Sequence, residues 1–311
     1  MAGIAVVGSA NLDLIGRAER LPRPGESVLG HGFSTSPGGK GANQAVACAR
    51  LGAPTSLVGR VGNDGFGPQL RANLQREGVD IAHLAVDDEA PTGVALIMVD
   101  DEGGNSILVA PGANGRLAER EVESALLANP PTAVLLQLEV PLACVLAAAR
   151  QGRAQGARVI LNPAPGQPLP RALLSLCDVL TPNEHELWLL AGQSAGKEEE
   201  RRVACRSLLD QGVGAVVVTL GAEGALVATR EAVSLVPGFS ITTVDTTGAG
   251  DAFNGALCVA LADGLPLLVA TRFACAAGAL ATTALGAQAA LPTRAEVEGF
   301  LAERCAGWRK T

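Results

Sequence analysis

The sequence predicts an α/β protein: a doubly wound, mostly parallel sheet flanked by helices, with a small β-sheet lid. Three observations lead to this prediction. Short apolar, β-branched runs recur, helical stretches rich in Ala, Leu and Arg separate most of them, and two strand-like segments interrupt the alternation. Strands that alternate with helices need right-handed crossovers, which cover both faces of a parallel sheet with helices. The interrupting strands then need a sheet of their own.

The predicted core strands are apolar runs at residues 4–7, 55–59, 133–138, 158–161, 178–181 and 215–220. Predicted helices separate many of them, at residues 42–51, 68–77, 142–155 and 201–211. Further helices are expected within residues 251–285 and 294–306, where they close the chain. Residues 194–202, which carry a run of Lys and Glu, are expected to form a solvated loop that leads into a helix.

Two segments are expected to form the small sheet. Residues 14–36 contain a turn at Pro22 and Pro24 and a strand-like stretch at 27–33, while residues 93–99 and 106–110 have a hairpin pattern around 100–104. Strands without covering helices must bury one face on a ligand or on another subunit. The predicted division is a core of residues 1–13, 37–92 and 111–311, and a lid that also serves for dimerisation, of residues 14–36 and 93–110.

Composition excludes several classes of protein. In the 311 residues, 48% are hydrophobic and 18% charged, which is enough apolar surface for an independently folded core. A net charge of −7 and the absence of Tyr argue against nucleic-acid binding. The N-terminal apolar run has no preceding basic segment and no run reaches the ~18 apolar residues of a membrane span, so neither a signal peptide nor a membrane partner is expected. Seven scattered cysteines favour reduced thiols in the cytoplasm.

Polar residues that follow predicted strands are the first candidates for a site, because open α/β sheets bind ligands beyond the carboxyl ends of their strands. Asn11 and Asp13 follow the first strand. Their short polar side chains could share the hydroxyls of a polyol, or Asn11 could form an Asx turn with its own backbone. The residue types alone favour the turn.

A glycine-rich segment, Gly38-Gly39-Lys40-Gly41-Ala42-Asn43-Gln44, leads into a predicted helix. Glycines let a backbone approach a ligand closely, and a helix N-terminus attracts negative charge. Lys40 is one of only three lysines among the 24 basic residues. In a chain that otherwise uses Arg, a lysine in this segment suggests a role for its compact charge. The spacing is not that of a P-loop. A plain glycine-rich turn is the alternative.

Asn183-Glu184-His185-Glu186 follows another predicted strand. Asn183 suits a helix N-cap and Glu186 the N3 position of a capping box, so a structural role explains both. Glu186 could also help to hold Mg²⁺ through water. The three histidines, which form no metal or nucleophile pattern, are His31, His83 and His185.

The most informative segment is Asp245-Thr246-Thr247-Gly248-Ala249-Gly250-Asp251, at the start of a predicted helix that runs to Ala262. Gly248 and Gly250 can expose successive N–H groups and form an anion hole. Asp251 could cap the helix, or it could accept a proton from a nucleophile beside a bound phosphate. A carboxylate repels a phosphate, so the combination favours phosphoryl transfer over simple phosphate binding.

Five segments in this order resemble the ribokinase family of sugar kinases: GSANLD near the start, GGKGAN at 38–43, TPNEHE at 181–186, TLGAEG at 219–224 and DTTGAGDAFNG at 245–255. The resemblance runs from the first strand to the last helices. Within the family, the segments at 137–139, 161–165 and 286–288 favour D-ribose as the substrate and transfer to its terminal hydroxyl.

The resemblance implies a role for each candidate residue. The sugar would be bound by Asn11, Asp13, Gly39, Lys40, Asn43, Glu139 and Asp251. Asp251 would be the general base, and the charge on the phosphoryl group would be held by the amides of Gly248, Ala249, Gly250 and Asp251. ATP would lie along Asn183, Thr219, Gly221, Glu223, Gly224 and Gly250, with Glu186 supporting Mg²⁺ through water.

The resemblance also implies an activating monovalent cation, usually K⁺. Its ligands would be the carboxylate of Asp245 and oxygens at Thr247, Ala281, Ala284, Gly286 and position 290. This sequence has Ala290 where ribokinases often offer a serine hydroxyl, so the cation would be held more weakly or with a different selectivity. The exposed face of the lid would pair with a second subunit in a homodimer.

Three alternatives remain open from the sequence. The chain could phosphorylate another substrate, such as deoxyribose, fructose or a nucleoside, or it could be a regulator that binds nucleotide or sugar without catalysis. A nicotinamide-dependent oxidoreductase is disfavoured, because the first turn reads Gly8-Ser9-Ala10-Asn11 and not G-x-G-x-x-G.

Overall fold

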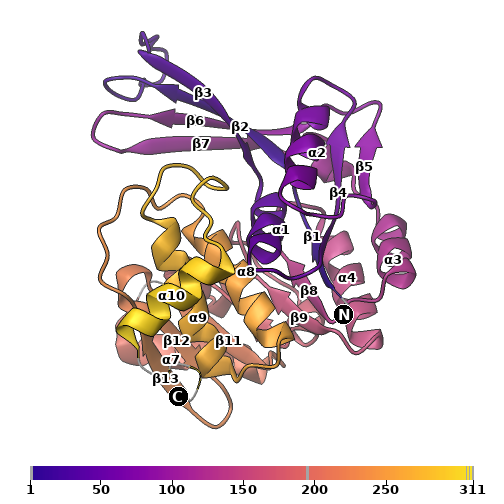
Figure 1. Ribbon diagram of the computed structural model, residues 1–311, viewed down its shortest axis with the longest axis vertical. Helices are drawn as coiled ribbons and strands as arrows, with labels where there is room; N and C mark the ends of the chain where they lie inside the picture. The colour runs from indigo at the N-terminus through magenta and orange to yellow at the C-terminus, as the bar shows by residue number, and fades with distance from the viewer. Residues whose placement is uncertain (1–2, 194–195, 306, 308, 310–311) are drawn as a thin grey trace.

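The computed structural model describes residues 3–193, 196–305, 307 and 309 and contains a large sheet and a separate small one (Figure 1). In the described residues the large sheet has nine strands, in the order β13-β12-β11-β10-β9-β8-β1-β4-β5. The strands are β1 (Ile4–Val7), β4 (Thr55–Gly62), β5 (Leu84–Asp87), β8 (Ala133–Leu136), β9 (Arg158–Leu161), β10 (Val179–Leu180), β11 (Ala215–Thr219), β12 (Gly224–Ala228) and β13 (Val233–Pro237). Strands β11 through β5 pair in parallel, while β12 and β13 extend one edge with antiparallel pairs.

The order of the strands reverses at β1. The chain runs from β1 outward to β4 and β5, and then crosses back to β8 and continues to β9, β10 and β11. β1 and β8 are therefore neighbours whose following loops diverge, and such a reversal opens a crevice at the carboxyl ends of the two strands. The segments that enter this crevice begin at Gly8 and Gln137.

Helices cover both faces of the large sheet (Figure 1). Alternate strand residues point to opposite faces, so Ile4 and Val6 join one hydrophobic cluster while Ala5 and Val7 join the other. The first cluster includes α1 (Lys40–Arg50), α2 (Phe66–Arg76), α8 (Ala249–Ala262), α9 (Leu267–Ala281) and α10 (Arg294–Arg304). The second includes α3 (Glu119–Ala128), α4 (Leu142–Ala154), α5 (Arg171–Leu174), α6 (Glu184–Ala191) and α7 (Glu198–Asp210). The doubly wound prediction is confirmed.

The small sheet projects from the body of the molecule (Figure 1). Its strands, in the order β3-β2-β6-β7, are β2 (Asn11–Arg17), β3 (Gly32–Gly38), β6 (Gly93–Val99) and β7 (Asn105–Ala110). The register pairs Asp13 with Ala95, and Ala95 with Val109, on one face, and it pairs Leu96 with Leu108 on the other. Side chains alternate along each strand, so the sheet presents an apolar surface on both sides.

Several sequence predictions of local structure were incomplete. The prediction of a strand at 27–33 was wrong, because β3 begins only at Gly32. The exposed residues of β3 are ordered by main-chain pairing with β2 and not by burial of apolar side chains. No prediction was made for strands β2, β5, β12 and β13, for helices α3 and α5, or for the short 3₁₀ helices η1 (Gly112–Arg116) and η2 (Gly221–Glu223). Residues 194–202 were predicted as a loop that leads into a helix, and α7 begins at Glu198 within this segment. Ser194 and Ala195 lie outside the described residues. The last helix was predicted to end at Ala306, which also lies outside the described residues.

Candidate active site

The first turn of α8 carries Asp251 beside a helix N-terminus without a side-chain cap. Gly248 is the N-cap residue, with a φ of 79° that favours glycine. The Ala249 N–H donates to the Thr246 carbonyl, so it is not free to bind a ligand. Within the described residues, the N–H groups of Gly248, Gly250 and Asp251 have no acceptor. Free amides at the positive end of a helix are suited to bind an anion.

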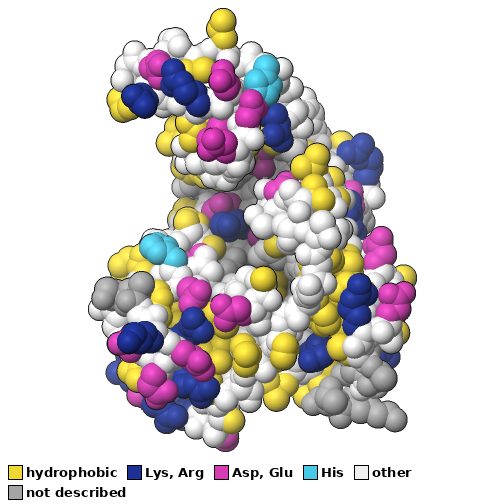
Figure 2. Space-filling view, turned by 90° about the vertical axis from the view of Figure 1, so that its left-hand side faces the viewer, with side chains coloured by type: hydrophobic (Ala, Val, Ile, Leu, Met, Phe, Trp, Pro, Cys, Tyr) yellow, Lys and Arg dark blue, Asp and Glu magenta, His cyan; other side chains and the backbone are white. Residues whose placement is uncertain are grey.

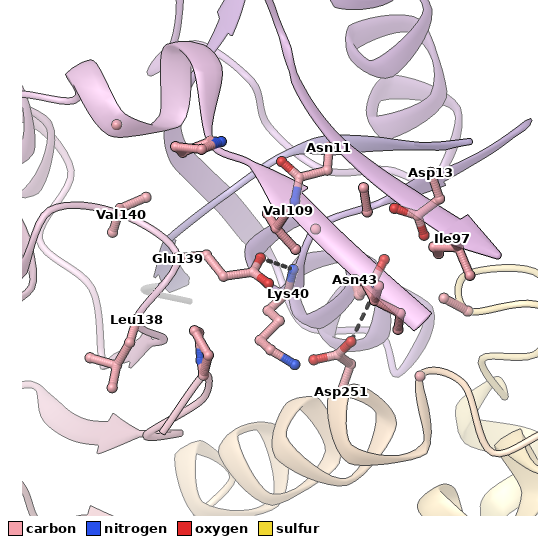
Figure 3. Close-up of a pocket in the computed structure, with 18 of the residues that line it drawn as sticks. Asn11, Asp13, Lys40, Asn43, Ile97, Val109, Leu138, Glu139, Val140 and Asp251 are labelled. Carbon is pink, nitrogen blue, oxygen red and sulfur yellow. Dashed lines mark hydrogen bonds between the residues drawn. The ribbon is translucent and has the colours of Figure 1, made fainter. Parts of the chain in front are cut away.

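The Asp251 carboxylate does not cap its own helix, so the capping alternative is wrong. Its Oδ1 accepts a 2.9 Å hydrogen bond from Gln44 Nε2, and its Oδ2 accepts a 2.8 Å bond from Asn43 Nδ2. Both donors lie near the start of α1, which the glycine-rich segment begins. Figure 3 shows the hydrogen bond from Asn43 to Asp251. The structure therefore brings two of the candidate segments into direct contact.

Burial raises the pKa of Asp251, while Lys40 and the two amides oppose this rise. In Figure 3 the amino group of Lys40 points toward the Asp251 carboxylate. Burial lowers the pKa of Lys40, but Asp251 and three further carboxylates outweigh it and raise the pKa, so Lys40 stays charged. A carboxylate with a raised pKa is a stronger base, and the ammonium group beside it can hold a second anion.

A cavity of about 740 Å³ lies between the small sheet and the carboxyl ends of β1 and β8. We call it the small-sheet cavity, and Figure 2 shows a hollow between the upper projection and the body of the molecule. The small sheet contributes apolar side chains to it: Ala95, Ile97, Ile107 and Val109. Its polar lining contains every residue that was predicted to bind a sugar: Asn11, Asp13, Gly39, Lys40, Asn43, Glu139 and Asp251.

Asn11 is held by a second amide and not by an Asx turn. Its Oδ1 accepts a 2.7 Å hydrogen bond from Asn114 Nδ2, and Asn114 is itself fixed by the backbone of Ala10. The Asn11 carbonyl oxygen is thereby occupied, which leaves the Nδ2 amide group as a donor for the cavity. Asn11 can therefore donate to a hydroxyl oxygen of a bound polyol.

Two further carboxyl groups complete the polar lining of this cavity. Burial, together with the charges of Glu139 and Asp251, raises the pKa of Asp13 to about 7, although Lys40 lowers it. Glu139 Oε2 accepts hydrogen bonds from Ser9 Oγ at 2.5 Å and from the backbone N–H of Lys40 at 3.0 Å. Carboxylate oxygens accept hydrogen bonds from hydroxyls, so both residues are suited to bind a polyol.

Two more cavities continue from Asp251 on the other side. A bridge cavity of about 230 Å³ is lined by the polar residues Lys40, Asn183, Glu186, Thr219 and Asp251 and by Gly248 and Gly250. It shares Thr219, Thr246 and Gly250 with a distal cavity of about 560 Å³, which is also lined by Gly221, Gly224, Phe239, Ile241 and Phe253. Glu223 lies in the same turn with its side chain exposed, and it is not part of this lining. A long ligand with a charged end fits this series of cavities.

Asn183 and Glu186 form the predicted capping box of α6. Asn183 Oδ1 accepts from Glu186 N at 2.8 Å, and Glu186 Oε2 accepts from Asn183 N at 2.9 Å. Burial raises the pKa of Glu186, against the Asn183 hydrogen bond and Lys40. One oxygen of this carboxylate is occupied and the residue lines the bridge cavity. Within the described residues no cluster of His, Cys, Asp or Glu could hold a metal by itself, so a metal here needs water and ligand oxygens.

Asp245 connects two loops beside the N-terminus of α8. Its Oδ1 accepts from Thr247 N and Oγ1, and its Oδ2 accepts from Gly286 N at 2.9 Å. Partial burial raises the pKa of Asp245, but the hydrogen bonds from Gly286 and Thr247 outweigh burial and lower it. The predicted cation residues Asp245, Thr247 and Gly286 are therefore in direct contact. Ala281 ends α9, and Ala284 and Ala290 lie in the loop that follows, where Ala290 offers no side-chain oxygen.

Comparison with known proteins identifies the family. The family described as "pfkB family carbohydrate kinase" matches residues 1–294. The chain belongs to this family. As a pfkB family carbohydrate kinase, it is 39% identical to the ribokinase of Haemophilus influenzae, over 96% of this chain and 98% of that protein. It is 38% identical to the ribokinase of Bacillus subtilis and 36% identical to a deoxyribokinase of Salmonella typhimurium, over 97% and 96% of this chain and 100% and 98% of those proteins.

Solved structures agree with this assignment to the pfkB family. The ribokinase from Thermotoga maritima matches with a TM-score of 0.90 and 36% identity, over 97% of this chain and 100% of that one. The ribokinase of Arabidopsis thaliana, solved with ribose and ATP, matches with a TM-score of 0.88 and 34% identity, over 97% and 99% of the two chains. This chain is therefore a sugar phosphotransferase of the pfkB family. Within the described residues, no helix combines the length and apolarity needed to cross a bilayer.

Sequence reasoning about this pfkB family kinase assigned no role to several buried amide side chains in and near the site. They are Gln44, Asn114, Gln137, Asn162, Asn254 and Gln288. Gln44 directly follows the predicted Asn43, and Asn162 ends a predicted strand, so position offered some signal for these two. Gln137, Gln288 and Asn254 lie in segments that carry the family resemblance, but no role was predicted for them, because their hydrogen-bond partners are distant in the chain.

Proposed function

We propose that this kinase transfers the γ-phosphoryl group of ATP to the terminal 5-hydroxyl of D-ribose, giving ribose 5-phosphate. The observation that supports this most strongly is the place of Asp251, which borders both the small-sheet cavity and the bridge cavity beside the free amides of Gly250 and Asp251. Ribose would occupy the small-sheet cavity, and the ATP phosphates the bridge cavity. The kinship with ribokinases supports the choice of sugar.

Direct in-line transfer follows from this arrangement. Asp251 accepts the proton of the ribose hydroxyl while that oxygen bonds to the γ-phosphorus, and the bond from phosphorus to the β–γ bridging oxygen breaks to release ADP. The amides of Gly248, Gly250 and Asp251 and the ammonium of Lys40 stabilise the charge that spreads over the transferred group. Asn11, Asp13 and Glu139 orient the sugar, so positioning supplies much of the acceleration.

ATP and two cations complete the proposal. The nucleotide extends along Asn183, Thr219, Gly221 and Gly224, and Glu223 reaches it only if its exposed side chain turns inward. Glu186 fits Mg²⁺ through water, because its carboxylate lines the bridge cavity and keeps one oxygen free of the capping box. Mg²⁺ bound with the nucleotide neutralises phosphate charge.

K⁺ is proposed at the loop that Asp245 organises. The ionised carboxylate of Asp245 and the carbonyls at Thr247, Ala281, Ala284 and Gly286 form an all-oxygen donor set, which suits a weakly hydrated monovalent cation. Bound there, K⁺ supplies positive charge near the anion-binding amides of α8. Ala290 adds no side-chain oxygen, so we expect a weaker or less selective site than one with serine at that position.

The lid, proposed as residues 14–36 and 93–110, contains most of the small sheet and also acts as a homodimer interface. Its inner face roofs the small-sheet cavity, and closure would exclude water from the reaction. On its outer face Leu96, Leu108 and Phe33 are 43%, 63% and 73% exposed. Apolar surface of this kind marks an interface. Light scattering on the purified protein tests this part, and a monomer at micromolar concentration contradicts it.

The proposed compartment is the cytoplasm, since all seven cysteines are free.

Coupled ADP detection with purified protein and MgATP tests the function. D-ribose, 2-deoxy-D-ribose, D-fructose and a nucleoside are compared, each with and without KCl. We expect the highest kcat/KM with ribose and a higher rate with KCl. A tenfold preference for another substrate overturns the choice of ribose. Absence of any sugar-dependent ATP turnover overturns the catalytic proposal and favours a binding protein.

A further inference from the structure

Two lines of buried side-chain amides end on the Asp251 carboxylate. In the shorter line, Gln137 Nε2 donates to Gln44 Oε1 at 2.5 Å, and Gln44 Nε2 donates to Asp251 Oδ1 at 2.9 Å. In the longer line, Gln288 Nε2 donates to Asn43 Oδ1 at 3.0 Å, and Asn43 Nδ2 donates to Asp251 Oδ2 at 2.8 Å. Each carboxylate oxygen therefore has its own amide donor.

The longer line continues to a charged group. Arg76 donates to Asn73 Oδ1 at 3.0 Å, and Asn73 Nδ2 donates to Gln288 Oε1 at 2.7 Å. A guanidinium can only donate and an ionised carboxylate can only accept, so the two ends set the direction of every hydrogen bond between them. The amide of Asn43 must then present its nitrogen, and not its oxygen, to Asp251.

Burial of the amide side chains stabilises this orientation of Asn43. Asn43, Asn73 and Gln288 are 6%, 8% and 5% exposed, and an unpaired polar group in such surroundings is strongly disfavoured. Gln288 belongs to neither α1 nor α8. It lies in the loop after α9, two residues beyond Gly286, which bonds to Asp245. From the same loop Ala287 lines the small-sheet cavity, whereas Gln288 bonds to Asn43.

We propose that Gln288 is a positioning residue for phosphoryl transfer: it acts through Asn43 to hold the Asp251 carboxylate in the orientation that accepts the substrate proton. This proposal rests on the proposed role of Asp251 as the base. Without Gln288, the oxygen of Asn43 loses its donor, and the amide is free to turn that oxygen toward Asp251, where two acceptors repel each other. A small misplacement of a reacting group costs about 10²-fold in rate.

The first experiment compares Gln288→Met with wild type in the ribose-dependent assay. Methionine keeps the length of the side chain but neither donates to Asn43 nor accepts well from Asn73. We expect kcat to fall about 10- to 100-fold, with KM for ATP within about twofold of wild type. Gln155→Met is the matched control, because Gln155 is a partly buried glutamine at the end of α4 that donates to Leu126 O, away from the site. It should leave kcat unchanged.

A double-mutant cycle separates action through Asn43 from a general loss of packing. In an Asn43→Ala background, Gln288→Met should lower kcat by less than about twofold, because its only route to Asp251 is already absent. Multiplicative losses in the two variants overturn the proposal, as does a Gln288→Met enzyme with kcat within twofold of wild type. Thermal unfolding of each variant is the readout independent of activity.

Two further outcomes are distinguishable. If Gln288→Met does not fold, Gln288→Glu replaces it, since ionised glutamate keeps the acceptor for Asn73 and loses the donor to Asn43; the same fall in kcat is expected, and normal turnover overturns the proposal. If wild type itself shows no ribose-dependent turnover, the proposed function has failed. If wild type is active and Gln288→Met is equally active, only the positioning role has failed.

Discussion

Asn43 of α1 donates a 2.8 Å hydrogen bond to Asp251 of α8. Both residues lie in the first turns of their helices, so this contact holds the two helix N-termini close together. Each helix has glycine as its N-cap residue, Gly39 with a φ of 87° and Gly248 with a φ of 79°. Two positive helix ends and Lys40 therefore face a group of carboxylates. Such a site can stabilise an incoming phosphoryl group while it keeps a base beside it.

Asp251→Asn should lower kcat by about 10² to 10⁴ and leave the chain folded and able to bind ATP, because asparagine keeps the shape of the side chain but cannot accept the proton. Its Nδ2 faces one of the two amide donors, so the melting temperature should fall. Steady-state kinetics and calorimetric ATP binding check this. Asp263→Asn, at the other end of α8, is the control. Turnover near the wild-type rate would remove Asp251 from the role of base.

Lys40→Met should lower kcat on the order of 10²-fold at neutral pH, since one positive group is lost from the transferring phosphoryl group. Lys40 also lowers the pKa of Asp251, so its removal should shift the acidic limb of the kcat/KM profile to higher pH. Lys40→Arg keeps the charge and should shift the limb less. A limb at the same pH in Lys40→Met would contradict the electrostatic link.

Asp13→Asn should change how stability depends on pH. The pKa of Asp13 is raised from 3.8 to about 7, so between these values the folded state holds a proton that the unfolded state has released. The wild-type free energy of unfolding should therefore fall as pH rises through this window, by up to about 1.4 kcal/mol per unit from this group. Asp13→Asn should fall less steeply in urea titrations. Equal slopes in the two proteins would be the contrary result.

Glu186→Gln should distinguish the role of Glu186 in the capping box from its proposed role in supporting Mg²⁺. Glutamine serves at N3 of a capping box, so the melting temperature should stay close to that of wild type. The loss of the carboxylate should raise the Mg²⁺ concentration for half-maximal rate. Glu296→Gln makes the same change in the capping box of α10 and should leave Mg²⁺ dependence unchanged. Identical Mg²⁺ titrations of wild type and Glu186→Gln would exclude the proposed role.

Asp245→Asn should weaken activation by K⁺, because asparagine keeps an oxygen to accept from Gly286 but lacks the charge. The measurement is the rate as a function of KCl, with choline chloride to hold the ionic strength constant. Ribose affinity by calorimetry should change less than the K⁺ response. An unaltered KCl curve would contradict the cation assignment.

The parts of the fold that follow from local pattern were predictable. β1, β8 and β9 are runs of apolar residues buried on both faces, and their sequence predicts them closely. Strands at or near the sheet edges were not predictable in the same way. β3 has an exposed, Ser-rich sequence, β12 follows a turn at Gly224 and pairs with β11, and β13 pairs with β12.

In the candidate site, too, some residues could be predicted from local sequence and others could not. Glycines, Lys40 and Asp251 stand out because their residue types are unusual where they occur. The amides that orient Asp251 do not stand out: Gln44 and Asn162 bond to each other across 118 positions of sequence, and Gln288 reaches Asn43 across 245. A single sequence contains no signal for such pairs, since any Asn or Gln can satisfy the same hydrogen bonds elsewhere.

Successive side chains of strand β6 lie on opposite faces of the small sheet. Ala95 and Ile97 line the small-sheet cavity, while Leu96 and Met98 lie on the opposite face. Exchanges at the first pair should therefore change which sugars are admitted without altering the proposed dimer interface, and exchanges at the second pair should do the reverse. Substrate range and the proposed dimer contact can then diverge independently along seven consecutive residues.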